Sequence, residues 1–174
     1  MKAILAGLFS CAVLSLPVMA QAPAAATGDQ AFVDMAAQID MTEAHLGQLA
    51  AENASSQDVK DFAQMLVTDH TADYNTLTAA ATKAGLTVPK GLDAKHDKMV
   101  APFEKLHGKA FDARFSHAMV AGHEEAIKAF TKESTDGQNA DIKSYASATL
   151  PALQKHLTGA QALGKAKKAA AAAQ

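Results

Sequence analysis

Apolar residues recur every three or four positions through most of this 174-residue chain, which is the spacing of one face of an α-helix. The pattern predicts four long helices, over residues 29–53, 57–84 and 109–134 and from residue 139 onward. No segment alternates with period two over a useful length, so we expect no sheet. Helices of about 25 residues, each about 37 Å long, are expected to pack side by side as a bundle.

The lengths of the connections predict how these helices are joined. The first and second helices are separated by only a few residues, as are the third and fourth, so each pair is expected to form an antiparallel hairpin. Residues 85–108 form a longer connection, with an extended piece around Pro89 and short helical pieces interrupted at Pro102. Such a stretch reaches about 44 Å, the length of the bundle. The predicted fold class is therefore all-α, a ferritin-like up-down four-helix bundle with a long crossover between the second and third helices.

Local polar residues predict where the helices begin and end. The sequence TGDQ at 27–30 fits a capping box for the first helix, and SSQD at 55–58 fits a cap for the second. Gly85 is expected to end the second helix. Asp112, near the start of the third helix, suits the positive end of the helix dipole.

The N-terminal residues have the composition of a secretory signal peptide. Lys2 precedes an almost unbroken apolar run, and Val18 and Ala20 place small residues where a signal peptidase reads them. We expect cleavage after Ala20, or after Ala22, and a periplasmic protein, with secretion as the alternative. The predicted organisation is a signal peptide (1–20), a flexible spacer (21–28), a helical bundle (29–166) and a Lys/Ala-rich tail (167–174).

Composition narrows the classes of function. Cys11, the only cysteine, lies in the predicted signal peptide, so the remaining chain has neither a disulfide nor a thiol nucleophile. Without Lys2 that chain has 15 Lys and Arg against 18 Asp and Glu, and it has no basic stripe interleaved with aromatic residues. We therefore expect no nucleic-acid partner, and no stable membrane span after cleavage. The sequence leaves open whether it binds a protein partner or forms a homo-oligomer.

One polar, potentially metal-ligating residue interrupts the apolar face of each predicted helix: Glu43, His70, His123 and His156. His70 and His123 lie almost equally far into the second and third helices, so they share a level if those helices run parallel. Glu43 lies within about one turn of that level and His156 within roughly 6 Å.

Three imidazoles and a carboxylate are ligands suited to zinc, iron, manganese or copper. Asp69, Asp73 and Glu124 are close enough in sequence to orient a ligand or to add one. The alternative interpretation is a buried hydrogen-bonded network of core histidines that binds no metal.

Ferritin-type di-iron chemistry is not expected on this chain. Such centres need Glu-x-x-His on two helices, but the residues three before the candidate histidines are Val67, Val120 and Leu153. The HExxH and GxSxG motifs of zinc proteases and serine hydrolases are also absent from the sequence.

Several segments spread along the predicted bundle carry a family resemblance. They are 43–47, 59–63, 65–70, Pro89, 106–108, Phe111-Asp112, Met119-Val120, His123, Leu150-Pro151 and His156-Leu157. Together they resemble the DUF4142 group of exported bacterial proteins, which are ferritin-like bundles without a settled activity. Phe115 departs from the resemblance, because a tyrosine is expected there. The resemblance implies export and the bundle fold but supplies no reaction.

The sequence thus favours an exported binding or stress-related protein rather than an enzyme, with the His/Glu cluster as its candidate site. Two alternatives remain. One is a metal-dependent redox enzyme that handles oxygen species, and the other is a purely structural bundle that acts through a partner surface.

Overall fold

The computed structural model describes residues 27–172, so the predicted signal peptide and its cleavage site lie outside the described residues. This part of the chain is helical and contains no strand, which confirms the predicted all-α class. None of its helices is both long enough and apolar enough to cross a membrane. The elements are α1 (Thr27–Asn53), α2 (Gln57–Ala84), α3 (Ala94–Val100), the 3-10 helix η1 (Phe103–Lys105), α4 (Gly108–Asp136) and α5 (Ala140–Ala172).

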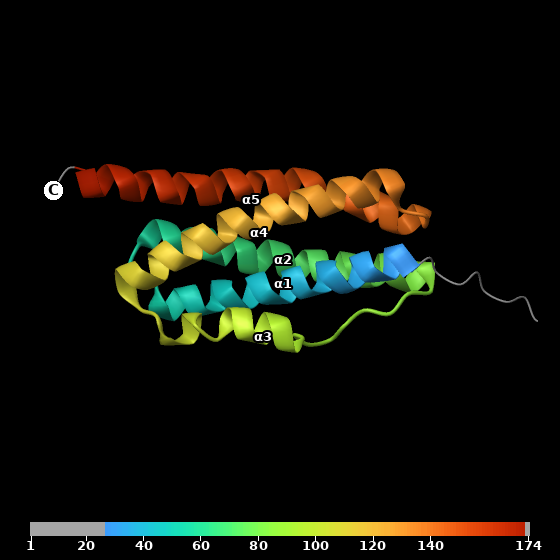
Figure 1. Ribbon diagram of the computed structural model, residues 1–174, viewed down its shortest axis with the longest axis horizontal. Coiled ribbons are helices and arrows are strands. Elements are labelled where there is room, and N and C mark those ends of the chain that lie inside the picture. The colour runs from blue at the N-terminus through green and yellow to red at the C-terminus, as the bar shows by residue number, and fades with distance from the viewer. Residues whose placement is uncertain (1–26, 173–174) are drawn as a thin grey trace, which may run out of the picture.

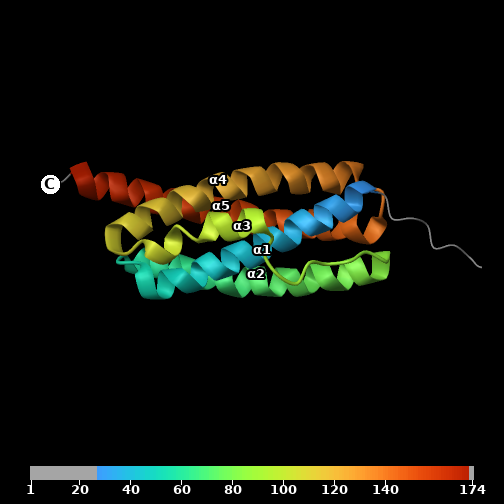
Figure 2. The ribbon, with the colours of Figure 1, turned by 60° about the horizontal axis from the view of Figure 1, so that its bottom comes forward.

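The four long helices form two antiparallel hairpins, α1–α2 and α4–α5, packed against each other (Figure 1). The crossover between α2 and α4 runs back along α1, and its helix α3 lies against α1 in both views (Figures 1 and 2). As a result α2 and α4 run in the same direction. The predicted four-helix bundle with a long crossover containing short helical segments is therefore confirmed.

The apolar core is divided into two halves along the bundle. One half packs around Phe32, Leu77 and Phe130, and the other around Leu66 and Phe111, with all five side chains nearly inaccessible. Each of the four long helices contributes to both halves, because each runs the length of the bundle. The residues between the halves are polar, and they form the site described below.

The turn of each hairpin is held by a carboxylate from the other hairpin. Asp29, in the first turn of α1, accepts hydrogen bonds from the backbone N–H groups of Gln138 (2.9 Å) and Asn139 (3.0 Å) between α4 and α5. Asp112, in the first turns of α4, accepts from the backbone N–H of Ser55 (3.0 Å) and Ser56 (3.1 Å), and from the Ser55 hydroxyl. These bonds tie the two hairpins together at opposite ends of the bundle.

Of the two predicted caps, the one at the start of α1 lacks the glutamine half of its capping box, and the one before α2 is confirmed in position but makes no side-chain bond. α1 begins at Thr27, inside the predicted spacer, and Gln30 bonds to the backbone of Thr87 in the crossover instead of completing a capping box. Ser56 precedes α2 but makes no side-chain cap. By contrast, α2 ends at Ala84 and is followed by Gly85 in the left-handed conformation (φ 71°), as expected.

Candidate metal centre

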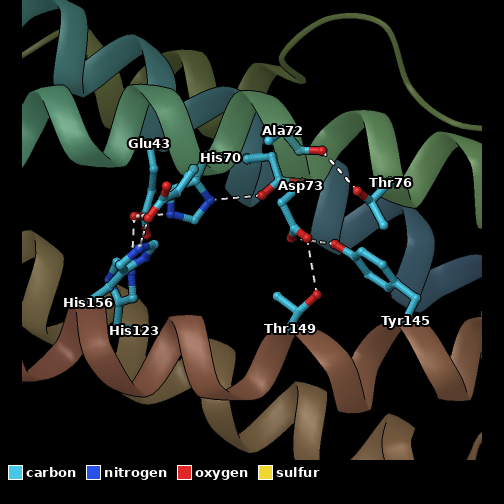
Figure 3. A network of polar contacts seen from close by, with 11 residues as sticks. Glu43, His70, Ala72, Asp73, Thr76, His123, Tyr145, Thr149 and His156 are labelled. Atoms are coloured by element: carbon cyan, nitrogen blue, oxygen red, sulfur yellow. Dashed lines mark hydrogen bonds and ion pairs between the residues drawn. The ribbon is translucent and has the colours of Figure 1, made fainter.

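The four predicted ligands come together (Figure 3), midway along the bundle and between the two halves of the apolar core. The register of each amphipathic helix turns one of them inward: Glu43 from α1, His70 from α2, His123 from α4 and His156 from α5. All four side chains are buried, and His123 is completely inaccessible.

The three imidazoles surround a common point. Their ring centroids are 5.3 Å apart for His70–His156 and His123–His156, and 5.8 Å apart for His70–His123. One nitrogen from each ring lies within 4.8 Å of the others. The Glu43 Oε2 atom lies 3.0 Å from His70 Nε2 and 3.4 Å from His123 Nε2. One carboxylate oxygen and the imidazole nitrogens thus occupy a single small volume.

The outer nitrogen of each ring is held by an acceptor. His70 Nδ1 lies 2.8 Å from Asp40 Oδ1, and His156 Nε2 lies 2.9 Å from Asp69 Oδ2. His123 Nδ1 lies 2.9 Å from the backbone carbonyl of Met119, which can only accept, so this nitrogen carries the proton. The same assignment for the other two rings places a lone pair on every inner nitrogen when the imidazoles are neutral.

The inner atoms, by contrast, lack well-formed hydrogen bonds, although Glu43 Oε2 lies at ion-pair distance from His70 Nε2 and His123 Nε2. His70 Nε2, His123 Nε2, His156 Nδ1 and Glu43 Oε2 are all inaccessible to solvent, and none makes a hydrogen bond of acceptable geometry. Buried polar atoms normally have partners, because leaving one unpaired costs about 1–3 kcal/mol. Four such atoms directed toward one another indicate a position that favours a cation.

The charges of the side chains in the centre also favour a cation at this position. Burial lowers the pKa of His70, but the Glu43 carboxylate and the hydrogen bond to Asp40 outweigh burial and raise it to about 10. Burial raises the pKa of Glu43, but the neighbouring His70 and His123 imidazoles outweigh burial and hold this pKa below its usual value. Burial also lowers the pKa of His156 and raises that of Asp40 to about 7. Glu43 is therefore the permanent negative charge of the centre.

The donor set fits a first-row transition metal. Tetrahedral zinc has ligands about 2.0–2.1 Å away, so neighbouring ligand atoms lie about 3.3 Å apart. The inner nitrogens lie within 4.8 Å of one another, which small side-chain movements would close to that spacing. Each imidazole also has the outer acceptor that metal-binding histidines normally have.

Asp69, Asp73 and Glu124, the residues expected to support the ligands, have different contacts. Asp69 does hold an imidazole, although it belongs to His156 on α5 rather than to its neighbour His70. Asp73 instead accepts hydrogen bonds from the Tyr145 hydroxyl (2.7 Å) and the Thr149 hydroxyl (3.1 Å). Glu124 is exposed, and within the described residues it has no hydrogen bond or ion pair with the cluster.

Asp40, the acceptor for His70, is not among the residues predicted from the sequence. Asp40 is only 2% exposed and its Oδ2 atom has no hydrogen-bond partner. It lies three residues before Glu43 on the same helical face, and this spacing was the available signal. The Met119 carbonyl was also missed, because a backbone acceptor leaves no trace in the sequence.

A groove between α2 and α5 reaches this centre from the surface. Its volume is about 360 Å³, and His70 and His156 contribute to its lining. Asp69, whose side chain is 38% exposed, lies between the buried His156 ring and solvent.

The comparisons with known proteins place the chain in a family but assign it no reaction. A similar solved structure is the crystal structure of a DUF305 fragment from Deinococcus radiodurans, with a TM-score of 0.68. The two are 16% identical over 82% of this chain and 99% of that one, so the likeness shows the helical-bundle fold alone. No curated protein matches the sequence. The sequence does match the domain of unknown function DUF4142 over residues 15–163, and the chain therefore belongs to the DUF4142 family.

Proposed function

We propose that this protein binds one first-row transition-metal ion through His70, His123, His156 and Glu43. One observation carries the proposal. The inner atoms of all four side chains are buried and directed at one another without a well-formed hydrogen bond, while the outer nitrogens of the three imidazoles are held by acceptors. A metal cation at the centre would satisfy all four inner atoms together.

The chemistry of the site favours this function over a purely structural polar network. A proton on His70 Nε2 would face Glu43 Oε2, which lies 3.0 Å away. It would still leave the inner nitrogens of His123 and His156 without a donor, because each ring already uses its proton on its outer partner.

The number of donors favours holding a metal over catalysis on it. Three imidazoles and one carboxylate complete a tetrahedral site, whereas catalytic zinc sites keep a position for water or substrate. We therefore infer a binding protein, for zinc or for iron, manganese or copper of similar ligand preference. A redox enzyme with the same ligands would need an open position on the metal. Either Glu43 would have to leave the metal, or the metal would need a higher coordination number.

The test is metal content and Co²⁺ binding in protein purified without a histidine tag. Co²⁺ is the probe because its visible spectrum reports coordination, whereas Zn²⁺ has a filled d shell and is silent. We expect about one equivalent of metal, removed by chelator and restored by Co²⁺ with a tetrahedral spectrum.

The matched variants are two double substitutions. His70→Ala with His123→Ala should abolish Co²⁺ binding. His107→Ala with His117→Ala removes two exposed imidazoles from α4 and its N-terminal boundary and should leave binding unchanged. Circular dichroism of the metal-free proteins separates loss of ligands from loss of fold. If wild-type protein neither contains metal nor binds Co²⁺, the proposal is wrong and the cluster is a structural polar network.

We also propose that the chain is exported to the periplasm after removal of residues 1–20. The support is the charged start, apolar run and small residues of the N-terminal sequence. Cell fractionation and the intact mass of the recovered protein test it. A mass beginning at Gln21 is expected, and unprocessed protein in the cytoplasm would contradict export.

A further inference from the structure

We propose that the groove between α2 and α5 is the route by which the metal ion reaches and leaves the centre. This inference rests on the proposed metal binding and assigns the path, which the ligands alone do not define. It makes α2 and α5 the face of the bundle that exchanges metal with the surroundings.

The groove connects solvent to two of the ligands. Its floor includes His70 and His156, which are 2% and 1% exposed, so the groove stops at the edge of the buried centre. Its rim includes Ala72 on α2 and Ala148 and Ala152 on α5, all exposed. Short alanine side chains on both helices leave the space open above the histidines.

The charge of the groove suits a cation. Asp69 and Asp73 both line it, one turn apart on α2. Asp73 is fixed by the hydroxyls of Tyr145 and Thr149, which donate to its two oxygens (Figure 3). Asp69 contacts the His156 ring at 2.9 Å and is partly exposed, so it spans the distance from solvent to a ligand. Carboxylates arranged along a cleft raise the local concentration of cations and the rate of their association.

The other two ligands do not line the groove. Glu43 and His123 are 5% and 0% exposed, and they approach the centre from α1 and α4. Two further surface cavities, one beside the crossover and one at the α4–α5 turn, include none of the four ligands in their linings. Of these three cavities in the described part of the chain, the groove is the one whose lining includes ligands of the centre.

An access route has a distinctive kinetic signature. A side chain that blocks the path raises the barrier for binding and for release by the same amount, because both use the path. The equilibrium constant depends only on the end states and stays unchanged. A substitution that damages the ligands instead changes the equilibrium constant.

The experiment is stopped-flow absorbance with Co²⁺ and metal-free protein, followed by release into excess chelator. Ala152→Phe places a large side chain in the groove without altering a ligand. We expect association and dissociation each to slow by about tenfold, with the Kd within about twofold of wild type. Ala148→Phe should act in the same way and serves if the first variant does not fold.

Gln154→Phe is the matched control, since this exposed residue is on the same helix but outside the groove. It should leave both rates unchanged. Raising the ionic strength should slow association in wild type by screening Asp69 and Asp73.

The outcomes separate this inference from the proposed function. If the wild-type protein binds Co²⁺ but neither folded groove variant changes either rate, the access route is wrong and the metal site stands. A change in the Kd without a matching change in both rates would also overturn it. If wild type binds no metal, both proposals fail.

Discussion

At the scale of single residues, the orientation of His70 depends on Asp40. The carboxylate of Asp40 accepts from His70 Nδ1 at 2.8 Å, and it is almost fully buried. Fixing the proton on the outer nitrogen leaves the inner nitrogen free to bind a metal.

We predict that Asp40→Asn weakens metal binding by about 10- to 100-fold. The amide keeps the shape of the side chain but lacks the negative charge that raises the basicity of the imidazole. Competition titration of Co²⁺ against a chelator of known affinity measures the change. Asp34→Asn, which alters an exposed carboxylate on the same helix, is the control and should leave the Kd unchanged. Equal affinity of the two variants would show that Asp40 does not orient the ligand.

The residues of the centre differ in how visible they are in the sequence. Glu43 and the three histidines interrupt regular apolar faces, so helical periodicity alone indicates that they point inward. Asp69 is adjacent to His70 in the chain, yet its side chain supports His156 across the α2–α5 interface. That pairing depends on how two helices are rotated against each other. One sequence without tertiary information does not specify this rotation.

At the scale of elements, local sequence patterns predicted the helices but not the side-chain bonds at the starts of α1 and α2. The start and end of α2 agree with the prediction: Ser56 precedes the helix, and Gly85 ends it by its own left-handed backbone conformation. The polar residues at the starts of α1 and α2 fit local caps by their spacing. In the structure, Gln30 bonds instead to the crossover, and Ser55 and Ser56 donate to Asp112 on α4. Long-range hydrogen bonds of this kind have no fixed sequence spacing.

Asp112 is expected to contribute strongly to stability through the α1–α2 turn. It accepts three hydrogen bonds from Ser55 and Ser56 and is 7% exposed. Asp112→Ala should lower the free energy of unfolding by about 2–3 kcal/mol, because charged acceptors form the stronger hydrogen bonds. That corresponds to a fall in Tm of about 5–10 °C.

Thermal unfolding of the metal-free protein measures the effect of Asp112. Ser55→Ala is the comparison, since it removes only the hydroxyl bond and leaves both backbone donors paired. It should cost less than about 1 kcal/mol. If the two variants unfold at the same temperature, the backbone hydrogen bonds of Asp112 do not stabilise the turn.

Glu133, near the end of α4, is expected to make stability depend on pH. Burial and the nearby Asp29 carboxylate raise its pKa to about 7, against the opposing charges of Lys132 and Lys143. The folded protein therefore binds this proton more tightly than the unfolded chain does. The stabilisation is complete below about pH 4.5 and is lost as the pH rises through about 7.

Glu133→Gln should remove this pH dependence. After allowing for solvent screening, we expect a gain of about 1 kcal/mol relative to wild type at pH 8 and little difference near pH 4.5. The difference in Tm between variant and wild type, measured across that range, cancels the titration of other groups. A difference that stays constant with pH would show that Glu133 does not titrate between these values.

At the scale of the whole molecule, the candidate metal centre joins side chains from both hairpins. α1 and α2 supply Glu43 and His70, while α4 and α5 supply His123 and His156. The centre lies where the apolar core is interrupted, so the hairpins meet there through polar side chains. A bound ion would replace the missing apolar contacts with four bonds from four different helices.

Metal binding is therefore expected to stabilise the whole fold rather than one element. An unfolded chain does not hold the four ligands together, so the ion binds the native state selectively. At a free metal concentration 100 times the Kd, the gain is about 2.7 kcal/mol, or about 5–10 °C in Tm. Calorimetry with Zn²⁺ and then with chelator measures this shift. The protein lacking His70 and His123 should show no shift. Hydrogen exchange supplies the sharper criterion, since protection must rise in both hairpins. Protection confined to α1 and α2 would mean that the ion does not join all four helices.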